Sequence, residues 1–352
     1  MSEQNTTGAD VVTPNGAAAP TAAEAPRTSG VQRLLSGSVG RNLGLVLALI
    51  VLVIVGAVTA PDTFLTVNNA MTILRAASIV GVISIGMTLV IIAGGIDLSV
   101  GAVMGLASVV AAIAAVQDLA DQSHWIVMVV VALAVGLAAG LINGVVIAYG
   151  KVVAFMATLA MLVAARGLAE IIAERRTLQV GNRDFIEFMN LDILGVDMLI
   201  WLFAIVAALG WVVLNRTTFG RRTVAIGGNR EAARLAGINV KRHTMWLYAI
   251  LGLCVGIAAV MILGRTTAGT STHGTLIELD VIAAVVVGGT LLVGGRGTIT
   301  GTVFGVLIFA TLTNVFVQNN LSSSVQNVAK GIIIVVAVLL QQRFAKPTGR
   351  AS

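Results

Sequence analysis

The stretch NRTTFGRRTVAIGGNREAARLAGINVKRHT (Asn215–Thr244) lies between two long apolar segments of the chain. It holds one acidic residue, Glu231, against seven basic ones: Arg216, Arg221, Arg222, Arg230, Arg234, Lys241 and Arg242. Loops of membrane proteins that are rich in Lys and Arg stay on the cytoplasmic side. If the flanking segments cross a membrane, this stretch therefore sets the direction in which the others cross it.

A short helix is predicted inside the stretch. Asn229 suits the N-cap, Glu231 places negative charge in the first turn, and Gly237 suits a left-handed stop. The residues concerned are Asn229, Glu231, Ala232, Ala233, Arg234, Leu235, Ala236 and Gly237. Two interpretations stay open: a surface on which a partner protein acts, or a solvated connector. The orientation rule alone explains the charge but not the capped helix.

The composition excludes a soluble globular protein. Of the 352 residues, 57% are hydrophobic and only 11% are charged, whereas soluble domains average roughly 25% charged residues. The mean hydropathy is +0.97. Thirty-nine glycines beside five prolines are typical of membrane helices that pack closely through small residues. The composition predicts an all-α polytopic membrane protein.

The net charge of +6 raises the question of nucleic acid. The basic residues lie in the gaps between apolar runs and form no stripe with aromatic residues, so we expect membrane lipid, not nucleic acid, as their partner. The single cysteine, Cys254, lies in an apolar run. It allows no internal disulfide and no cysteine-based metal site.

Ten spans are predicted, because a membrane helix needs about 20 mostly apolar residues. Residues 1–37 are predicted to be a disordered cytoplasmic tail, 38–342 the transmembrane domain with the cytoplasmic loop 215–244, and 343–352 a second cytoplasmic tail. The first span is expected to remain uncleaved. The spans are 43–60, 70–93, 98–116, 125–148, 152–173, 197–214, 245–263, 279–293, 298–317 and 325–341.

The distribution of Lys and Arg orients these spans. With the N-terminus inside, fifteen basic residues fall on the cytoplasmic side and four on the outer side. The four are Arg175, Arg176, Arg183 and Arg265. This bias is that of a multi-pass protein with both termini in the cytoplasm.

Two hairpins interrupt the spans in the same way, GGIDLSVGAVMGL (Gly94–Leu106) and GGRGTITGTVFGV (Gly294–Val306). A glycine pair ends one helix of each, and either Asp97 or Ser99 is expected to cap the third span. The offset of 200 residues predicts an internal duplication with both hairpins facing the cytoplasm. Their structural residues are Gly94, Gly95, Asp97, Ser99, Gly101, Gly294, Gly295 and Gly301.

Glycines spaced by four residues predict close helix packing. They recur at Gly136, Gly140 and Gly144, at Gly101 and Gly105, and at Gly301 and Gly305.

No enzyme site emerges from the sequence. The pair Gly150-Lys151 is followed by Val152 and has Val145 where a phosphate-binding loop needs glycine. His124, His243 and His273 are far apart and lack ligand spacing. We therefore expect neither catalysis nor a cofactor or metal bound by this chain.

Six ionisable residues fall in the outer half of the predicted membrane: Arg75, Arg166, Glu170, Glu278, Asp280 and Lys330. Arg166 and Glu170 are one turn apart and are expected to pair. For Arg75 and Lys330 we favour side chains that extend to the outer interface. For Arg166, Glu170 and Asp280 we predict a hydrophilic outer vestibule.

The middle of the spans is predicted to lack Asp, Glu and His, which disfavours a carrier coupled to protons or sodium. Uncharged polar residues remain there: Thr88, Asn143, Thr158, Thr290 and Asn314. They suit either the path of a neutral, hydroxyl-rich solute or hydrogen bonds between packed helices.

Four blocks carry a resemblance to a known family: IGMTLVIIAGGIDLSVGAVMGL (Ile85–Leu106), FMATLAMLVAARGLAEII (Phe155–Ile172), AIGGNREAARLAGINV (Ala225–Val240) and ELDVIAAVVVGGTLLVGGRGTITGTVFG (Glu278–Gly305). Together they resemble the permease subunit of ABC importers for monosaccharides, of the ribose, galactose, xylose and galactofuranose type. The similarity runs from the second span to the end of the chain.

The resemblance implies a type II ABC importer fold in the plasma (inner) membrane of a prokaryote. It implies a second permease copy, identical or different, a cytoplasmic ATPase subunit that hydrolyses the ATP, and an extracytoplasmic sugar-binding protein. The segment Asn229–Gly237 matches the coupling helix that docks on the ATPase. A secondary, ion-coupled carrier of a small polar solute is the alternative.

Overall fold

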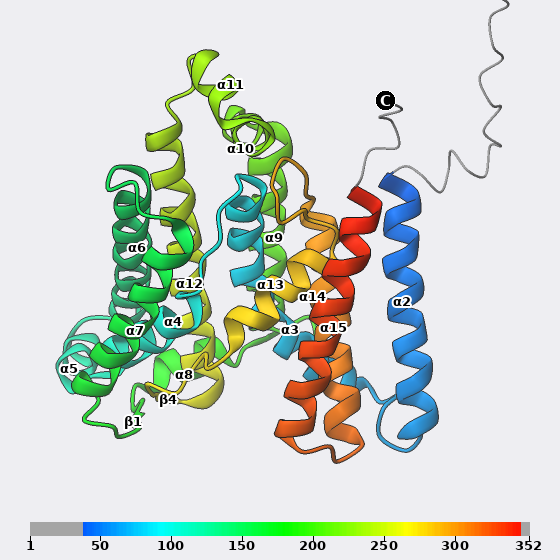
Figure 1. Ribbon diagram of the computed structural model, residues 1–352. Helices are drawn as coiled ribbons and strands as arrows, with labels where there is room; N and C mark the ends of the chain where they lie inside the picture. Colours follow the sequence, from blue (N-terminus) through cyan, green and yellow to red (C-terminus); the bar gives the residue numbers. More distant parts are fainter. Residues whose placement is uncertain (1–37, 346–352) are drawn as a thin grey trace, which may run out of the picture.

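The computed structural model describes residues 38–345, which form an almost entirely helical bundle (Figure 1). The predicted tails lie outside this range, except that 343–345 continue the last helix. The helices are α2 (Ser38–Thr59), α3 (Val67–Ile92), α4 (Val100–Ala112), α5 (Ala114–Gln122), α6 (Ile126–Ala148), α7 (Ala154–Ile172), α8 (Arg183–Met189), α9 (Met198–Arg216), α10 (Thr218–Gly228), α11 (Arg230–Leu235), α12 (Val240–Thr266), α13 (Ile277–Val287), α14 (Ile299–Gln318) and α15 (Ser323–Ala345). The all-helical class predicted from the composition is confirmed.

Strands occur among the described residues only as two antiparallel pairs of two residues each. β1 (Leu178–Gln179) pairs with β4 (Ala268–Gly269), and β2 (Asp192–Ile193) pairs with β3 (Val196–Asp197). Both pairs lie in connections between helices. In Figure 1, β1 and β4 lie at the end of the molecule opposite α11.

Six described helices are long and apolar enough to cross a membrane: α3, α6, α7, α9, α12 and α14. The bent pair α4–α5 makes a seventh if it counts as one span, and apolar parts of α2 and α15 are shorter. The predicted third span (98–116) corresponds to α4 and the start of α5, and the chain bends by 55° between these two helices at Ile113. Ile113 has an extended backbone (φ −64°, ψ 149°) that no helix continues through.

The predicted eighth span (279–293) is wrong as a full crossing. Its helix, α13, has 11 residues and ends at Val287. At 1.5 Å per residue it rises about 16 Å, roughly half of the hydrocarbon thickness. Gly289, Gly294 and Gly295 follow with positive φ angles, so the chain returns to the α11 end of the molecule as a loop.

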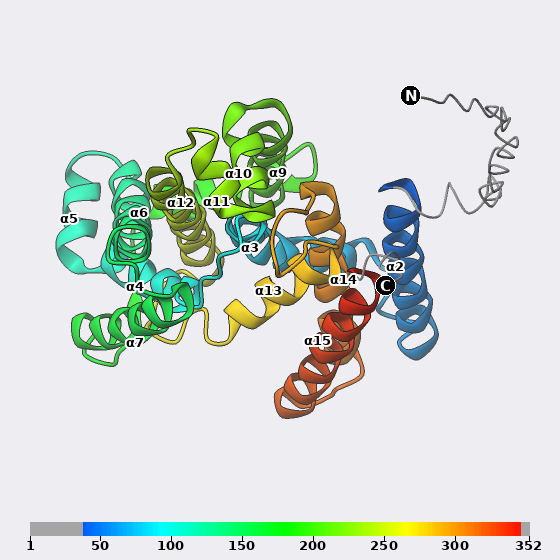
Figure 2. The same ribbon diagram turned by 45° about the horizontal axis from the view of Figure 1, so that its top comes forward.

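The core is built around α3 and α12. Their most apolar windows are 83% and 78% buried, against 22% for α7 and α9. Figure 2 shows α3 between α12 on one side and α14 on the other, with α6 and α7 on the outside. The outer helices therefore present apolar surface to lipid or to another membrane protein.

The contact between α12 and α6 depends on glycines from both helices. A Cβ atom at Gly140 would lie 2.3 Å from the carbonyl oxygen of Tyr248, and one at Gly252 would lie 2.2 Å from that of Gly136. The predicted close packing at Gly136, Gly140 and Gly144 is confirmed. In a membrane the hydrophobic effect does not drive helices together, so helix association depends on close van der Waals packing. The glycines allow the backbones of α6 and α12 to pack in this way.

We expect Gly140→Ala to destabilise the protein, because the new methyl group meets backbone atoms of α12 that cannot rotate away. The cost should be about 1–3 kcal/mol, typical of an overpacked site, and is measured from the thermal unfolding midpoint in detergent. Gly167→Ala is the matched control, since a Cβ atom at this position on α7 would have no other atom within 4 Å. Equal losses for both variants would contradict the packing argument.

Candidate functional site

The basic stretch folds into α10 and α11, which project from one end of the bundle (Figure 1). The Asn229 side chain accepts a hydrogen bond from the amide of Ala232 at 2.9 Å, and Gly237 has a φ of +82°. The cap and the stop predicted for this helix are therefore confirmed. α11 also carries Glu231 in its first turn and Arg234 in its last, where each charge suits the helix dipole.

One face of α11 is anchored and the other is free. Ala233 is 5% exposed and packs with Ile226 of α10 and Val240 of α12. Leu235, on the opposite side, is 80% exposed, and the ion pair between Glu231 and Arg234 (3.0 Å) is also exposed. α11 thus presents an exposed apolar side chain beside an exposed ion pair.

α10 was not predicted from the sequence. It begins at a Thr217 cap, whose hydroxyl accepts from the amide of Gly220 at 3.2 Å. Its Thr223 hydroxyl lies 2.8 Å from Nε2 of His243 on α12, and the ring of Phe219 lies 4.2 Å from the His243 ring. Thr217 at the end of an apolar run was the available signal for this second helix.

The end of α10 meets both hairpins in a contact of backbone on backbone, which we call the glycine junction (Ile92–Gly94, Gly227 and Gly294–Gly295). The Gly295 amide donates to the carbonyl of Ile92 at 2.8 Å. A Cβ atom at Gly227 would lie 1.7 Å from the same carbonyl oxygen and 2.5 Å from the Gly295 nitrogen. Both predicted hairpins thus lie at the α11 end of the molecule and contact α10, the helix on which α11 packs.

The first hairpin is held by Asp97. Its carboxylate accepts from the amide and the hydroxyl of Ser99, at 2.8 and 2.6 Å, and from the side-chain amide of Asn143 at 3.2 Å. Ser99 precedes α4 but its side chain caps no amide there, and Asp97 binds the amide of Ser99, one residue before the helix. The predicted side-chain cap of the third span is therefore formed by neither residue. Asp97 is buried inside the bundle but lies in the connection between α3 and α4, so the absence of carboxylates from the middle of the spans stays a prediction.

The second hairpin uses different contacts. Thr298 caps α14 by accepting from the amide of Gly301 at 3.1 Å. A Cβ atom at Gly301 would lie 2.0 Å from the carbonyl oxygen of Gly288, whereas one at Gly101 in the first hairpin would meet the carbonyl oxygen of Gly274. The glycines that match in sequence therefore pack on different partners, and duplication of the hairpins stays a prediction.

At the opposite end, the predicted pair of Arg166 and Glu170 does not form. Arg166 donates to the carbonyl oxygens of Ser271 and His273, while Glu170 pairs with Arg175 at 3.3 Å. The loop from Thr267 to Leu276 packs against α4 and leaves its carbonyls within reach of Arg166. Burial and the nearby Arg166 charge lower the pKa of His273, whose Nδ1 lies 3.1 Å from the Ser108 hydroxyl.

Arg75 and Lys330 each form an ion pair. Their extension to the outer interface stays a prediction. Arg75 pairs with Asp197 at 2.8 Å, and Lys330 pairs with Asp280 at 2.9 Å. Each charge meets a carboxylate from a distant part of the chain, which lowers the cost of placing it near the hydrocarbon.

The three residues of the predicted outer vestibule have different partners: Arg166 binds the Thr267–Leu276 loop, Glu170 pairs with Arg175, and Asp280 pairs with Lys330. Asp280 faces α15 and lines a separate cleft of about 320 Å³ together with Arg265 and Asn314. The vestibule therefore stays a prediction, with Arg166 and Asp280 in different surroundings.

Two of the five uncharged polar residues predicted inside the spans, Thr88 and Asn314, bind another helix. Thr88 and Thr302 share a hydrogen bond of 2.7 Å, and Asn314 donates to Asn69 at 2.7 Å. Asn143 binds Asp97, and Thr158 donates to a carbonyl of its own helix at 2.8 Å. For Thr88 and Asn314, the interpretation as hydrogen bonds between packed helices is confirmed.

Comparisons with known proteins agree with this geometry. A family model described as "Branched-chain amino acid transport system / permease component" matches residues 69–338. The "Ribose import permease protein RbsC" of Bacillus subtilis is 39% identical over 314 residues (89% of this chain, 96% of that protein). RbsC of Haemophilus influenzae is 38% identical over 297 residues (83% and 90%). The "L-arabinose ABC transporter permease protein AraH" of Azospirillum brasilense is 33% identical over 326 residues (92% and 93%).

The chain belongs to the family of ABC importer permeases. No solved structure matches it. The match includes α3 to α14 almost complete, and so both hairpins and the α10–α11 segment. As an ABC importer permease the chain is a transport component. Its Gly150-Lys151 pair lies at the turn between α6 and α7.

The described residues of this permease bring no three His, Cys, Asp or Glu side chains together as a possible metal site. Two features stand out instead: α11 with its exposed surface, and the glycine junction beneath it.

We expect Gly227→Ala to disrupt the glycine junction, because its methyl group has no space between Ile92 and Gly295. The unfolding midpoint should fall, and trypsin should cleave faster at the arginines of α10 and α11. The adjacent Gly228→Ala is the control, since nothing lies within 4 Å of the added Cβ. If both variants behave alike, the junction does not hold α10 in place.

A second test concerns the predicted vestibule. In a Cys254→Ala background, cysteines at Arg166 and Asp280 should react with a membrane-impermeant thiol reagent added from outside. A cysteine at Thr88, which is fully buried, should stay unmodified and serves as the control. Protection of both outer positions would exclude a hydrophilic vestibule there.

Proposed function

We propose that this chain is the translocation subunit of an ATP-driven monosaccharide importer. Its relatives include permeases named for ribose and L-arabinose, which supports a sugar as the solute. The proposed path is neutral and hydroxyl-tolerant, and the chain itself binds no ATP. The observation that carries the proposal is α11, a capped and exposed helix seated on the glycine junction.

A separate ATPase subunit is proposed to dock on α11. An apolar contact with a polar rim is the usual arrangement of a protein interface, and Leu235 is exposed beside the exposed Glu231–Arg234 pair. Ala233 fixes α11 to α10 and α12, so a displacement of α11 would carry α10 with it. The glycine junction would pass that displacement to α3 and α14.

The remaining partners follow from the same proposal. A sugar-binding protein would deliver the solute at the end that carries β1 and β4. A second permease copy, identical or different, would cover exposed apolar surface such as that of α7. In the inner membrane of a prokaryote the α11 end would be cytoplasmic, and so would both termini, because α2 begins and α15 ends at that end (Figure 1).

No observation favours the alternative of an ion-coupled carrier. Asp97, the carboxylate buried within the bundle, already accepts three hydrogen bonds from Ser99 and Asn143. The proposal is tested with the chain in proteoliposomes beside its ATPase and binding protein, using a panel of labelled pentoses and hexoses. Uptake should require ATP, and uptake driven by an ion gradient alone would overturn the proposal.

Leu235→Asp should uncouple transport, because it places a charge at the centre of the proposed interface. Loss of such an anchor costs about 2 kcal/mol or more, so we expect the ATPase to co-purify poorly and uptake to fall at least tenfold. Leu194→Asp is the control: Leu194 is 90% exposed but lies in the β2–β3 turn. It should leave co-purification of the ATPase intact. Normal retention of the ATPase by Leu235→Asp would exclude α11 as the dock.

A further inference from the structure

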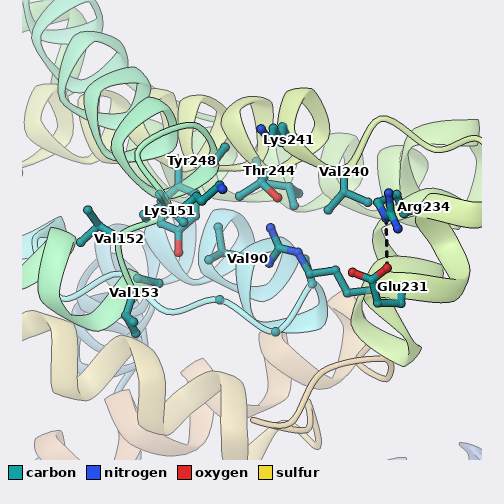
Figure 3. A pocket seen from close by; sticks show the side chains of 18 residues that line it. Val90, Lys151, Val152, Val153, Glu231, Arg234, Val240, Lys241, Thr244 and Tyr248 are labelled. Atoms are coloured by element: carbon teal, nitrogen blue, oxygen red, sulfur yellow. Dashed lines mark hydrogen bonds and ion pairs between the residues drawn. The ribbon is translucent and has the colours of Figure 1, made fainter.

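A cleft of about 600 Å³ opens beside α11. Its walls come from the end of α3 with Gly94 and Gly95, from the turn between α6 and α7, from α11, and from the first turns of α12. Figure 3 shows Lys151 approaching it from one wall and Lys241, Thr244 and Tyr248 from another, with the Glu231–Arg234 pair at its α11 side.

Four cationic side chains line this cleft: Lys151, Arg230, Arg234 and Lys241. The single carboxylate in the lining is Glu231, and it is already paired with Arg234 at 3.0 Å. Lys151 and Arg230 form no ion pair with any residue that the structure describes. Lys241 has only the ring of Tyr149, 5.9 Å away. The cleft therefore carries positive charge that the described chain leaves unneutralised.

The rule that orients membrane proteins does not account for this convergence. It requires basic residues on the cytoplasmic side but not around one cavity. Arg221, Arg222 and Arg242 satisfy the rule while lying outside the lining of the cleft. Three separate segments of the chain instead bring their cations to the same space.

Lys151 lines the cleft with an unfavourable backbone conformation. Its φ is +58°, in the left-handed region that residues other than glycine and asparagine rarely adopt. Residues kept in such conformations are concentrated at ligand sites. Here the conformation lets the chain turn from α6 into α7 while the lysine lines the cleft.

The rest of the lining suits a ligand with one charged group. Val90, Val152, Val153 and Leu247 supply apolar surface. α7 begins beside the cleft at Ala154, and its N-cap residue, Val153, has no side-chain acceptor for the first amides. Those amides add to the positive potential of the lysines and arginines.

We propose that this cleft binds a phosphate ester, held by Lys151 and Lys241 from two walls and by Arg230 from α11. A phosphate group offers several charged acceptors at once, which is what converging Lys and Arg side chains recognise. The ester belongs either to the headgroup of an anionic phospholipid or to a soluble phosphate monoester. Bound there, it ties α11 to the α6–α7 turn. This site goes beyond the proposed transport function and does not depend on it.

The experiment uses the purified full chain and two probes. Glycerol 3-phosphate is titrated by calorimetry, with glycerol at matched ionic strength as the reference. In the second arm, the chain is exchanged into micelles that contain phosphatidylglycerol or phosphatidylcholine, and retained lipid is counted by native mass spectrometry. The variants are Lys151→Gln and Lys241→Gln, with Arg242→Gln as the matched control. Arg242 carries the same charge one residue along the chain but does not line the cleft.

Each lysine variant should weaken binding about tenfold, because one charge-assisted contact is lost, while Arg242→Gln should bind like the native chain. Sensitivity in the calorimetric arm identifies a soluble ester, and sensitivity only in the phosphatidylglycerol arm identifies a lipid. Lys151→Arg keeps the charge and should retain binding, which separates loss of charge from loss of fold. Binding of neither probe, or equal losses for all three Gln variants, would overturn the proposal.

Discussion

The structure depends on a place where three segments of backbone meet without side chains between them. Gly227, the end of α3 and the Gly294–Gly295 turn approach so closely that any Cβ at Gly227 would overlap the Ile92 carbonyl. Inside a membrane protein, backbone groups outside helices need partners within the protein. The bond from the Gly295 amide to the Ile92 carbonyl supplies one such pair at 2.8 Å. Glycine is thus required by space at Gly227 and by backbone conformation at Gly294 and Gly295.

This contact connects the exposed end of the molecule to its core. α10 and α11 are fixed to α12 through His243 and Val240, and to α3 through the glycine junction. α3 in turn contacts α14 deep in the bundle, where Thr88 and Thr302 share a hydrogen bond. A closely packed interior transmits displacement and does not absorb it. A displacement of α11 would therefore also displace α3 and α14 at the centre of the bundle.

Features fixed by neighbours in sequence could be predicted, and features fixed by distant residues could not. The cap at Asn229 and the stop at Gly237 depend on a few consecutive residues, and both were predicted correctly. The partners of Arg75 and Lys330 are Asp197 and Asp280, 122 and 50 residues away, and no local pattern indicates them. The length of the eighth span was mispredicted for a related reason. Hydropathy continues through 279–293, while the left-handed Gly289 that follows α13 is a matter of backbone conformation.

The placement of charge bears on where energy could enter a transport cycle. Asp97 is saturated by Ser99 and Asn143, and Asp280 is paired with Lys330. A carboxylate that couples transport to an ion must exchange its partners during the cycle, and partners supplied by the same chain compete with that exchange. The described surface around α11 is different, since Leu235 is exposed and several cations there lack carboxylate partners. A driving partner would find its strongest unmet interactions at that end, which is also where the glycine junction links the surface to the core.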